Sequence, residues 1–170
     1  MDFDFGALER RIEAAARQAF SDAIERVGNE SIYAFALYSD DGAMTVCPAV
    51  NTVEYVEQND AKNPGDSDYY RFETAEWKYE AVGAEDQFKV ICDTVRNEVL
   101  AKEEDEAWFE AFQQQLYETC ERVLVKLKGE GFFEEKLGRE VFLLFNVTEF
   151  EFSKAELLDL PACHPSSSWR

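Results

Sequence analysis

The chain has few of the residues that build metal sites or disulfide frameworks. Its 170 residues include one histidine, His164, and four cysteines. No two cysteines form the close CxxC pair that zinc sites commonly use on a turn. The four thiols, Cys47, Cys92, Cys120 and Cys163, are widely separated along the chain. We therefore expect reduced cysteines that pack as small apolar side chains, with no metal and no other cofactor.

Long apolar runs are also missing. No stretch approaches the roughly 18 apolar residues that a membrane-spanning helix needs. The first five residues, MDFDF, lack the basic region and apolar run of a signal peptide. These absences predict a cytoplasmic protein without membrane contacts. No internal repeat or linker interrupts the chain, so we expect a single domain over residues 1–160 and a C-terminal tail over residues 161–170.

Positive charge is scarce. The chain carries 36 Asp and Glu against 17 Lys and Arg, a net charge of −19. A field of this sign repels nucleic acids and anionic membranes, and it speeds encounter with basic proteins. The charge therefore predicts a basic protein partner and no nucleic-acid partner. The alternative is that the acidic residues serve only to keep the protein in solution.

Hydrophobic periodicity predicts an α+β fold, with an antiparallel or mixed sheet of three to five strands packed against several helices. The clearest helices cover residues 8–27, 88–99 and 109–127, and the alanines on the apolar face of the first indicate close packing. Residues 31–38 are apolar on both faces, which is typical of a central strand. Residues 43–48 read as the returning strand of a hairpin, and residues 140–147 as a further buried strand.

The remaining segments give weaker patterns. A short helix is expected to begin at Asn51, and residues 69–72 to form a third strand or extended segment. Thr74 is expected to cap a short helical stretch that carries Trp77. Ser153 and Glu156 have the spacing of a capping box and predict a final helix.

No residue set matches a catalytic or phosphate-binding motif. Cys163 and His164 are neighbours in the chain, and adjacent residues rarely point at each other productively. Gly129 and Gly131 follow a helix, whereas a phosphate-binding loop follows a strand. Carboxylates are so numerous that no particular pair is indicated for acid–base chemistry. An enzyme that uses paired carboxylates stays open as an alternative.

Acidic and aromatic residues alternate between residues 54 and 86. This segment carries ten acids and three bases, interleaved with Tyr, Phe and Trp. Aromatic anchors among steering carboxylates suit an Arg- or Lys-rich partner. We expect the contact residues to be Asp66, Asp68, Tyr69, Tyr70, Glu73, Glu76 and Trp77. The alternative is that the aromatics pack against the sheet while the acids only solvate it. A second acidic tract, residues 98–121, is most simply a solvated helix face.

Several segments together resemble a bacterial family of unknown function, the one numbered 4303. They are residues 32–38, Met44–Pro48 with Asn51 and Thr52, Tyr70–Phe72 with Ala75–Trp77, and Gly131–Phe133 with the strand that follows. The resemblance supplies no catalytic residues. It implies a bacterial source, and more loosely the setting of polymorphic toxin systems, in which small acidic proteins serve as immunity factors.

Together these observations predict a non-enzymatic acidic binding protein, in concrete form an immunity-type inhibitor of a basic bacterial toxin domain. An acidic scaffold or regulatory protein that binds a neutral partner through an apolar patch is a further alternative.

Overall fold

A computed structural model describes residues 2–102 and 105–148 of the chain. Over these residues it contains six α-helices, one 3₁₀-helix and four strands. The elements are α1 (Phe5–Val27), β1 (Ile32–Asp40), β2 (Cys47–Thr52), α2 (Val53–Lys62), α3 (Ser67–Phe72), η1 (Thr74–Glu76), β3 (Tyr79–Glu80), α4 (Glu85–Ala101), α5 (Glu106–Gly129), α6 (Phe132–Leu137) and β4 (Phe142–Thr148). The predicted α+β class is confirmed. The predicted tail and the helix expected at Ser153 lie outside the described residues.

The sheet is mixed, with the strand order β3-β2-β1-β4. β2 pairs antiparallel with both β1 and β3, and β1 pairs parallel with β4. β1 is buried along almost its whole length. The prediction of a central strand covered on both faces is therefore confirmed, since neither face of β1 meets water.

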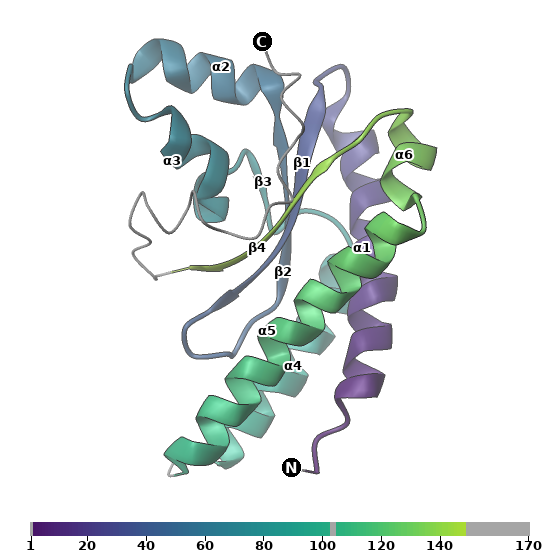
Figure 1. Cartoon of the computed structure of the whole chain (residues 1–170), viewed down its shortest axis with the longest axis vertical. Coiled ribbons are helices and arrows are strands. Elements are labelled where there is room, and N and C mark those ends of the chain that lie inside the picture. Colours follow the sequence, from purple (N-terminus) through teal and green to yellow (C-terminus); the bar gives the residue numbers. More distant parts are fainter. Residues whose placement is uncertain (1, 103–104, 149–170) are drawn as a thin grey trace.

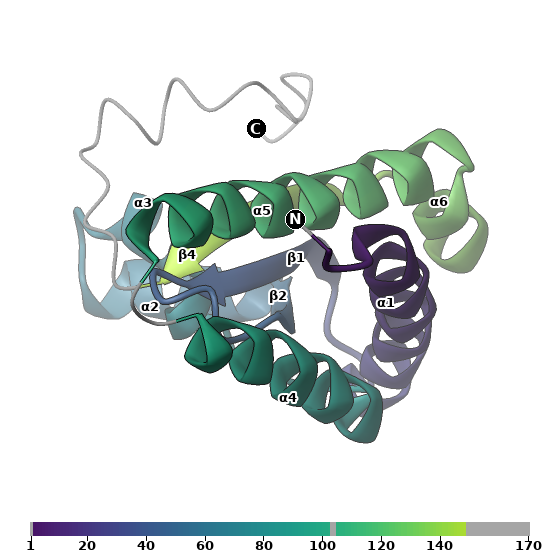
Figure 2. The same cartoon turned by 90° about the horizontal axis from the view of Figure 1, so that it is seen from below.

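Each face of the sheet has its own layer. Figure 1 shows α2 and α3 on the opposite side of the sheet from α1, α4 and α5. α1 lies between α4 and α5 and contacts both of them (Figure 2). The larger core fills the space under these long helices, and Phe20, Phe35 and Phe133 meet at its centre with ring centroids 4.8–5.5 Å apart.

The alanine face of α1 permits close packing, as the sequence predicts. Ala15, Ala16, Ala19 and Ala23 are all fully buried. The loop that precedes α4 lies directly on this face, because a Cβ added to Gly83 would come within 2.6 Å of the carbonyl oxygen of Ala19. The next amide, that of Ala84, donates to the Asp22 carboxylate on α1 at 2.9 Å.

The hairpin strand predicted at residues 43–48 was placed too early. Asp40 Oδ1 accepts hydrogen bonds from the amides of Met44 and Thr45 at 2.8 and 2.9 Å, and from the Thr45 hydroxyl at 3.0 Å. These bonds hold residues 41–46 in a wide loop, so the returning strand begins at Cys47. Pro48 therefore lies near the start of β2, whereas the predicted strand ended at this residue, so that prediction was wrong.

Residues 69–72 form a helix, so the prediction of an extended segment was wrong. The amides of Tyr70 and Glu73 donate to the carbonyls four residues earlier, as in an α-helix. The aromatic content favours a strand, but the sheet edge is taken by β3, whose two residues pair with Ala49 and Val50. Neither β3 nor the short helix α6 was predicted. The helix expected from Asn51 begins at Val53, because Asn51 itself stays in β2.

Candidate partner-binding surface

All seven predicted contact residues belong to α3, to η1 or to the residues that flank them. Together residues 66–76 form what we call the α3–η1 surface, on the side of the sheet away from the three long helices (Figure 1). Asp66 is the N-cap residue of α3, and its side chain makes no capping hydrogen bond. Glu73 is the N-cap residue of η1, and its side chain accepts from the Ala75 amide. The fold thus brings most of the predicted set together on one layer.

Tyr69 is the most exposed aromatic residue of this surface. Half of its side-chain area meets solvent, at 50% exposure. Its hydroxyl donates to Glu76 Oε1 at 3.1 Å, and this bond raises the pKa of Tyr69. Its ring packs edge-on against Tyr70, with the centroids 5.4 Å apart. The surface therefore presents an aromatic ring with a carboxylate fixed beside it.

Two carboxylates on this layer, the exposed Asp66 and the half-buried Glu76, have no basic partner among residues 2–102 and 105–148. The ion pairs made by bases of this side are Arg71 with Asp60, at 3.8 Å, and Lys78 with Glu30. Neither includes Asp66 or Glu76. Because a carboxylate without a cation nearby keeps its full field in solution, these two groups can steer a basic ligand.

Two buried asparagines hold this layer against the sheet. Asn51 on β2 donates through Nδ2 to the Tyr33 hydroxyl at 3.1 Å and to the Tyr70 carbonyl at 3.0 Å. Asn146 on β4 donates to the Phe72 carbonyl at 3.4 Å and to the Thr74 hydroxyl at 3.3 Å. Buried amides with all these partners fix the position of the segment they bind. Sequence reasoning missed both residues, although an Asn inside an apolar strand was a visible signal.

Trp77 is not available for contact with a partner. Its side chain is 3% exposed and packs with Ala34, Ala36, Ala49 and Leu144 in the smaller core. Its indole N–H donates to the Arg71 carbonyl at 3.1 Å. Trp77 was predicted as a contact residue because aromatic residues mark interfaces, but here its area covers the alanines of the sheet. Tyr70 is half-buried, and its hydroxyl accepts from Asn63 Nδ2 at 3.1 Å.

Glu73 is held partly out of water at the edge of this surface. Burial raises the pKa of Glu73, and the nearby Glu76 carboxylate adds to the effect, while the Ala75 amide opposes it. The Asn146 amide also lies 3.5 Å from its Oε1. The carboxyl group of Glu73 consequently binds its proton more tightly in the native state than in the unfolded chain.

From this we predict the pH dependence of a Glu73→Gln variant. Where folding raises the pKa of a carboxyl group, the free energy of unfolding falls as pH rises through that pKa. The reason is that losing the proton costs more free energy in the native state than in the unfolded chain. Glu73→Gln should therefore melt at a higher temperature than wild type at pH 7, and the gain should vanish below about pH 4. Thermal melts between these pH values measure the difference in melting temperature from wild type, with Glu25→Gln on α1 as the control for net charge. A gain in melting temperature that grows as pH falls would contradict the raised pKa of Glu73.

The bases of the long helices are mostly bound to acids. Arg17 pairs with Glu13 at 2.8 Å and also with Glu130, and Lys126 pairs with Glu13 at 2.7 Å. On α4, Lys89 and Arg96 both pair with Asp93. These pairs neutralise part of the charge on the helical side.

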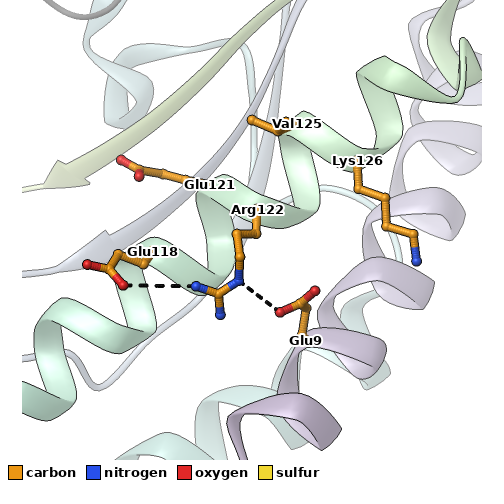
Figure 3. A pocket seen from close by; sticks show the side chains of 6 residues that line it. All are labelled: Glu9, Glu118, Glu121, Arg122, Val125 and Lys126. Carbon is orange, nitrogen blue, oxygen red and sulfur yellow. Dashed lines mark hydrogen bonds and ion pairs between the residues drawn. The ribbon is translucent and has the colours of Figure 1, made fainter.

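A shallow groove of about 560 Å³ lies between α1 and α5. It is lined by Glu9, Glu118, Glu121, Arg122, Val125 and Lys126 (Figure 3). Arg122 lies between two of the carboxylates, 3.0 Å from Glu9 and 3.9 Å from Glu118. Acid–base catalysis by a carboxylate pair needs two groups that face a substrate, and here a guanidinium occupies the space between them. The groove thus lends no support to the enzyme alternative.

Large exposed apolar side chains are spread over several helices. Within the described ranges they are Tyr69 on α3, Val90 and Leu100 on α4, and Val125 on α5. Val90 and Leu100 are ten residues apart, which is about 15 Å along a helix. Each of these residues offers a single apolar contact, which gives little support to a partner held by one apolar patch.

Neither a metal cluster nor a membrane-spanning helix occurs in residues 2–102 and 105–148. No group of three or more His, Cys, Asp or Glu in this part of the chain could hold a metal ion. No helix there is both long enough and apolar enough to cross a membrane.

Comparison with known families identifies the chain at the level of sequence family. The model of the family described as "Domain of unknown function (DUF4303)" matches residues 12–159. The chain therefore belongs to this family, as the resemblance indicated. No curated protein and no solved structure matches the chain.

Proposed function

We propose that this DUF4303 protein is a binding protein that receives a basic protein partner on its α3–η1 surface. The observation that supports the proposal most directly is the arrangement of Asp66, Tyr69 and Glu76. An exposed tyrosine lies among carboxylates that no base neutralises within the described part of the chain. This combination suits an Arg- or Lys-rich ligand.

The physical roles of these residues differ. Tyrosine is enriched among the residues that dominate binding energy, because it buries a large area and loses little conformational entropy. The Tyr69 ring also offers its face to a cation from the partner. Unpaired carboxylates around it raise the rate of encounter with a positively charged protein. Asn51 and Asn146 fix the surface from below, which lowers the cost of ordering it on binding.

In its most specific form, the proposed partner is a basic bacterial toxin domain and the protein is its cytoplasmic immunity-type inhibitor. The net charge of −19 supports a partner of opposite charge. The toxin setting rests on the family resemblance alone. Inhibition would follow from occlusion, because a protein that covers the mouth of an active site excludes the substrate without chemistry of its own.

The proposal predicts that acids of the α3–η1 surface matter more than acids elsewhere. A site variant, Asp66→Asn with Asp68→Asn and Glu76→Gln, removes three negative charges from this surface. A control variant, Glu25→Gln with Glu110→Gln and Glu135→Gln, removes three from exposed positions on α1, α5 and α6. Tagged forms of both are used to capture partners from a lysate of the native host, and the captured proteins are identified by mass spectrometry.

Wild type and the control variant should capture the same basic protein, and the site variant should lose most of it. Truncation or neutralisation of one central interface contact commonly costs about 1–2 kcal/mol, so three together should cost about 3–6 kcal/mol and weaken binding by at least about a hundredfold. Circular dichroism of both variants checks that each is folded. Equal capture by the two variants, or capture of acidic and neutral proteins only, would refute the proposal.

A further inference from the structure

Cys47 and Cys92 come from distant parts of the chain and lie near each other where β2 begins. Cys47 is the first residue of β2, and Cys92 lies on α4. Cys92 Sγ accepts from the Val46 amide at 3.4 Å, and its thiol donates to the Val46 carbonyl at 3.3 Å. β3 pairs with Ala49 and Val50 and does not extend to Val46. The Cys92 thiol therefore satisfies the Val46 amide and carbonyl in place of a neighbouring strand.

The two thiols lie near each other, because Cys92 Sγ is hydrogen-bonded to Val46, the residue that precedes Cys47, and each thiol shifts the pKa of the other. Both side chains are partly exposed, so a small reagent can reach them. The ionisable groups near Cys47 are Tyr38 and Glu80, whose side chains are hydrogen-bonded to each other. Those near Cys92 are Arg96 and Asp40.

This arrangement makes the two sulfurs chemically unequal. The Cys47 thiol, the Val46 amide and the positive charge of Arg96 lower the pKa of Cys92 to about 7, against the opposing effect of burial. The Cys92 thiol, together with burial, raises the pKa of Cys47. The thiolate is the reactive form of cysteine. Cys92 therefore has the character of an attacking thiolate, with a second thiol beside it.

We propose that Cys47 and Cys92 are a redox pair that hydrogen peroxide converts into a disulfide between β2 and α4. In the first step the Cys92 thiolate attacks one peroxide oxygen and the O–O bond breaks. A sulfenic acid forms, and the released hydroxide takes a proton to become water. In the second step the Cys47 sulfur attacks the Cys92 sulfur. The S–S bond forms, the S–O bond breaks, and hydroxide leaves with the Cys47 proton as a second water.

Cys120 provides an internal comparison. It is fully buried on α5, and burial raises its pKa. A thiol that is both protonated and inaccessible reacts slowly with oxidants. If Cys92 only filled space beside Val46, it would behave in the same way, and no cross-link to Cys47 would form.

The test uses the full chain with Cys163→Ser, which removes the thiol that lies outside the described residues. The protein is treated with a small excess of hydrogen peroxide, free thiols are blocked with an alkylating reagent, and unreduced peptides are mapped by mass spectrometry. We expect one cross-linked species, Cys47 with Cys92, that has lost two hydrogen atoms and is restored by dithiothreitol. Cys120 should be recovered alkylated only after unfolding.

Single substitutions separate the role of Cys92 as the attacking thiolate from that of Cys47 as the resolving thiol. In Cys47→Ser, peroxide should add oxygen to Cys92, because no resolving thiol is present. In Cys92→Ser, the remaining Cys47 should react roughly tenfold more slowly at neutral pH than Cys92 does in Cys47→Ser, because burial still raises the pKa of Cys47 and keeps its thiolate fraction small. Circular dichroism confirms the fold of each variant. Separately alkylated Cys47 and Cys92 after peroxide treatment, at rates equal to those in the single variants, would overturn the proposal.

Discussion

Replacing Gly83 with alanine is expected to lower the free energy of unfolding by about 3–5 kcal/mol. The residue has a φ of 94°, a left-handed conformation that side chains adopt at a cost. A Cβ at this position would also lie 2.6 Å from the Ala19 oxygen and 2.7 Å from the Ala19 Cα. Both are backbone atoms of α1, so no side-chain rotation can relieve the clash. The loop before α4 would have to move away from α1.

Gly131→Ala is the matched control, because it imposes the conformational strain without the clash. Gly131 has a φ of 70°, and a Cβ there would meet nothing within 4 Å. Its cost should stay near 1–2 kcal/mol. Urea denaturation of both variants measures the difference, provided that the slope with denaturant is unchanged. Equal losses in the free energy of unfolding would mean that the loop before α4 does not pack tightly enough on α1 for a Cβ at Gly83 to clash with Ala19.

Replacing Trp77 with alanine is expected to cost about 3–5 kcal/mol of folding stability. The substitution opens a cavity over the alanines of β1 and β2 and leaves the Arg71 carbonyl without its indole donor. Tyr69→Ala removes an exposed aromatic side chain of the α3–η1 surface, and it should change the free energy of unfolding by only about 0.5 kcal/mol. Denaturation and partner capture are measured on both variants.

The two readouts distinguish a structural from a binding role. We expect Trp77→Ala to lose stability, and to lose binding only in proportion to the unfolded fraction. We expect Tyr69→Ala to stay folded and to bind weakly. A Trp77→Ala variant of full stability that no longer captures the partner would restore Trp77 as a direct contact, as the sequence pattern suggested.

The parts of the fold that were predicted from sequence are those with long, regular patterns. The continuous apolar run of β1 and the three- and four-residue steps on the long helices extend over enough residues to identify each element. The errors arose where one side chain decides the local structure. The Asp40 carboxylate holds the hairpin loop open, and nothing in the apolar pattern of residues 43–48 reports that bond.

The candidate site was predicted only in part. The acidic and aromatic composition of residues 66–77 marked the segment, and the fold gathers most of it on one layer. Composition does not distinguish a buried aromatic from an exposed one, so Tyr69 and Trp77 were assigned the same role. Their burial depends on tertiary packing, because the alanines of the sheet leave space that an indole fills. The Cys47–Cys92 contact joins residues 45 positions apart and could not be predicted from spacing.

Net charge alone cannot locate a binding surface, and this protein illustrates why. Its acidic residues occur along the whole chain, including the helices α4 and α5. The ion pairs among α1, α4 and α5 bind many of the bases to acids there. What differs on the α3–η1 surface is the combination of unpaired carboxylates with an exposed tyrosine ring.

We propose that these carboxylates, in this place, recognise positive charge on a partner. The most direct test measures the dissociation constant of the purified basic partner for wild type, the site variant and the control variant, at about 50 mM and about 500 mM salt. We predict that wild type and the control variant bind tightly at low salt and weaken by at least about tenfold at high salt. The site variant should bind weakly at both concentrations, with a smaller change between them. Equal weakening of the two variants, or affinities that ignore salt, would show that the acidic residues only solvate the protein.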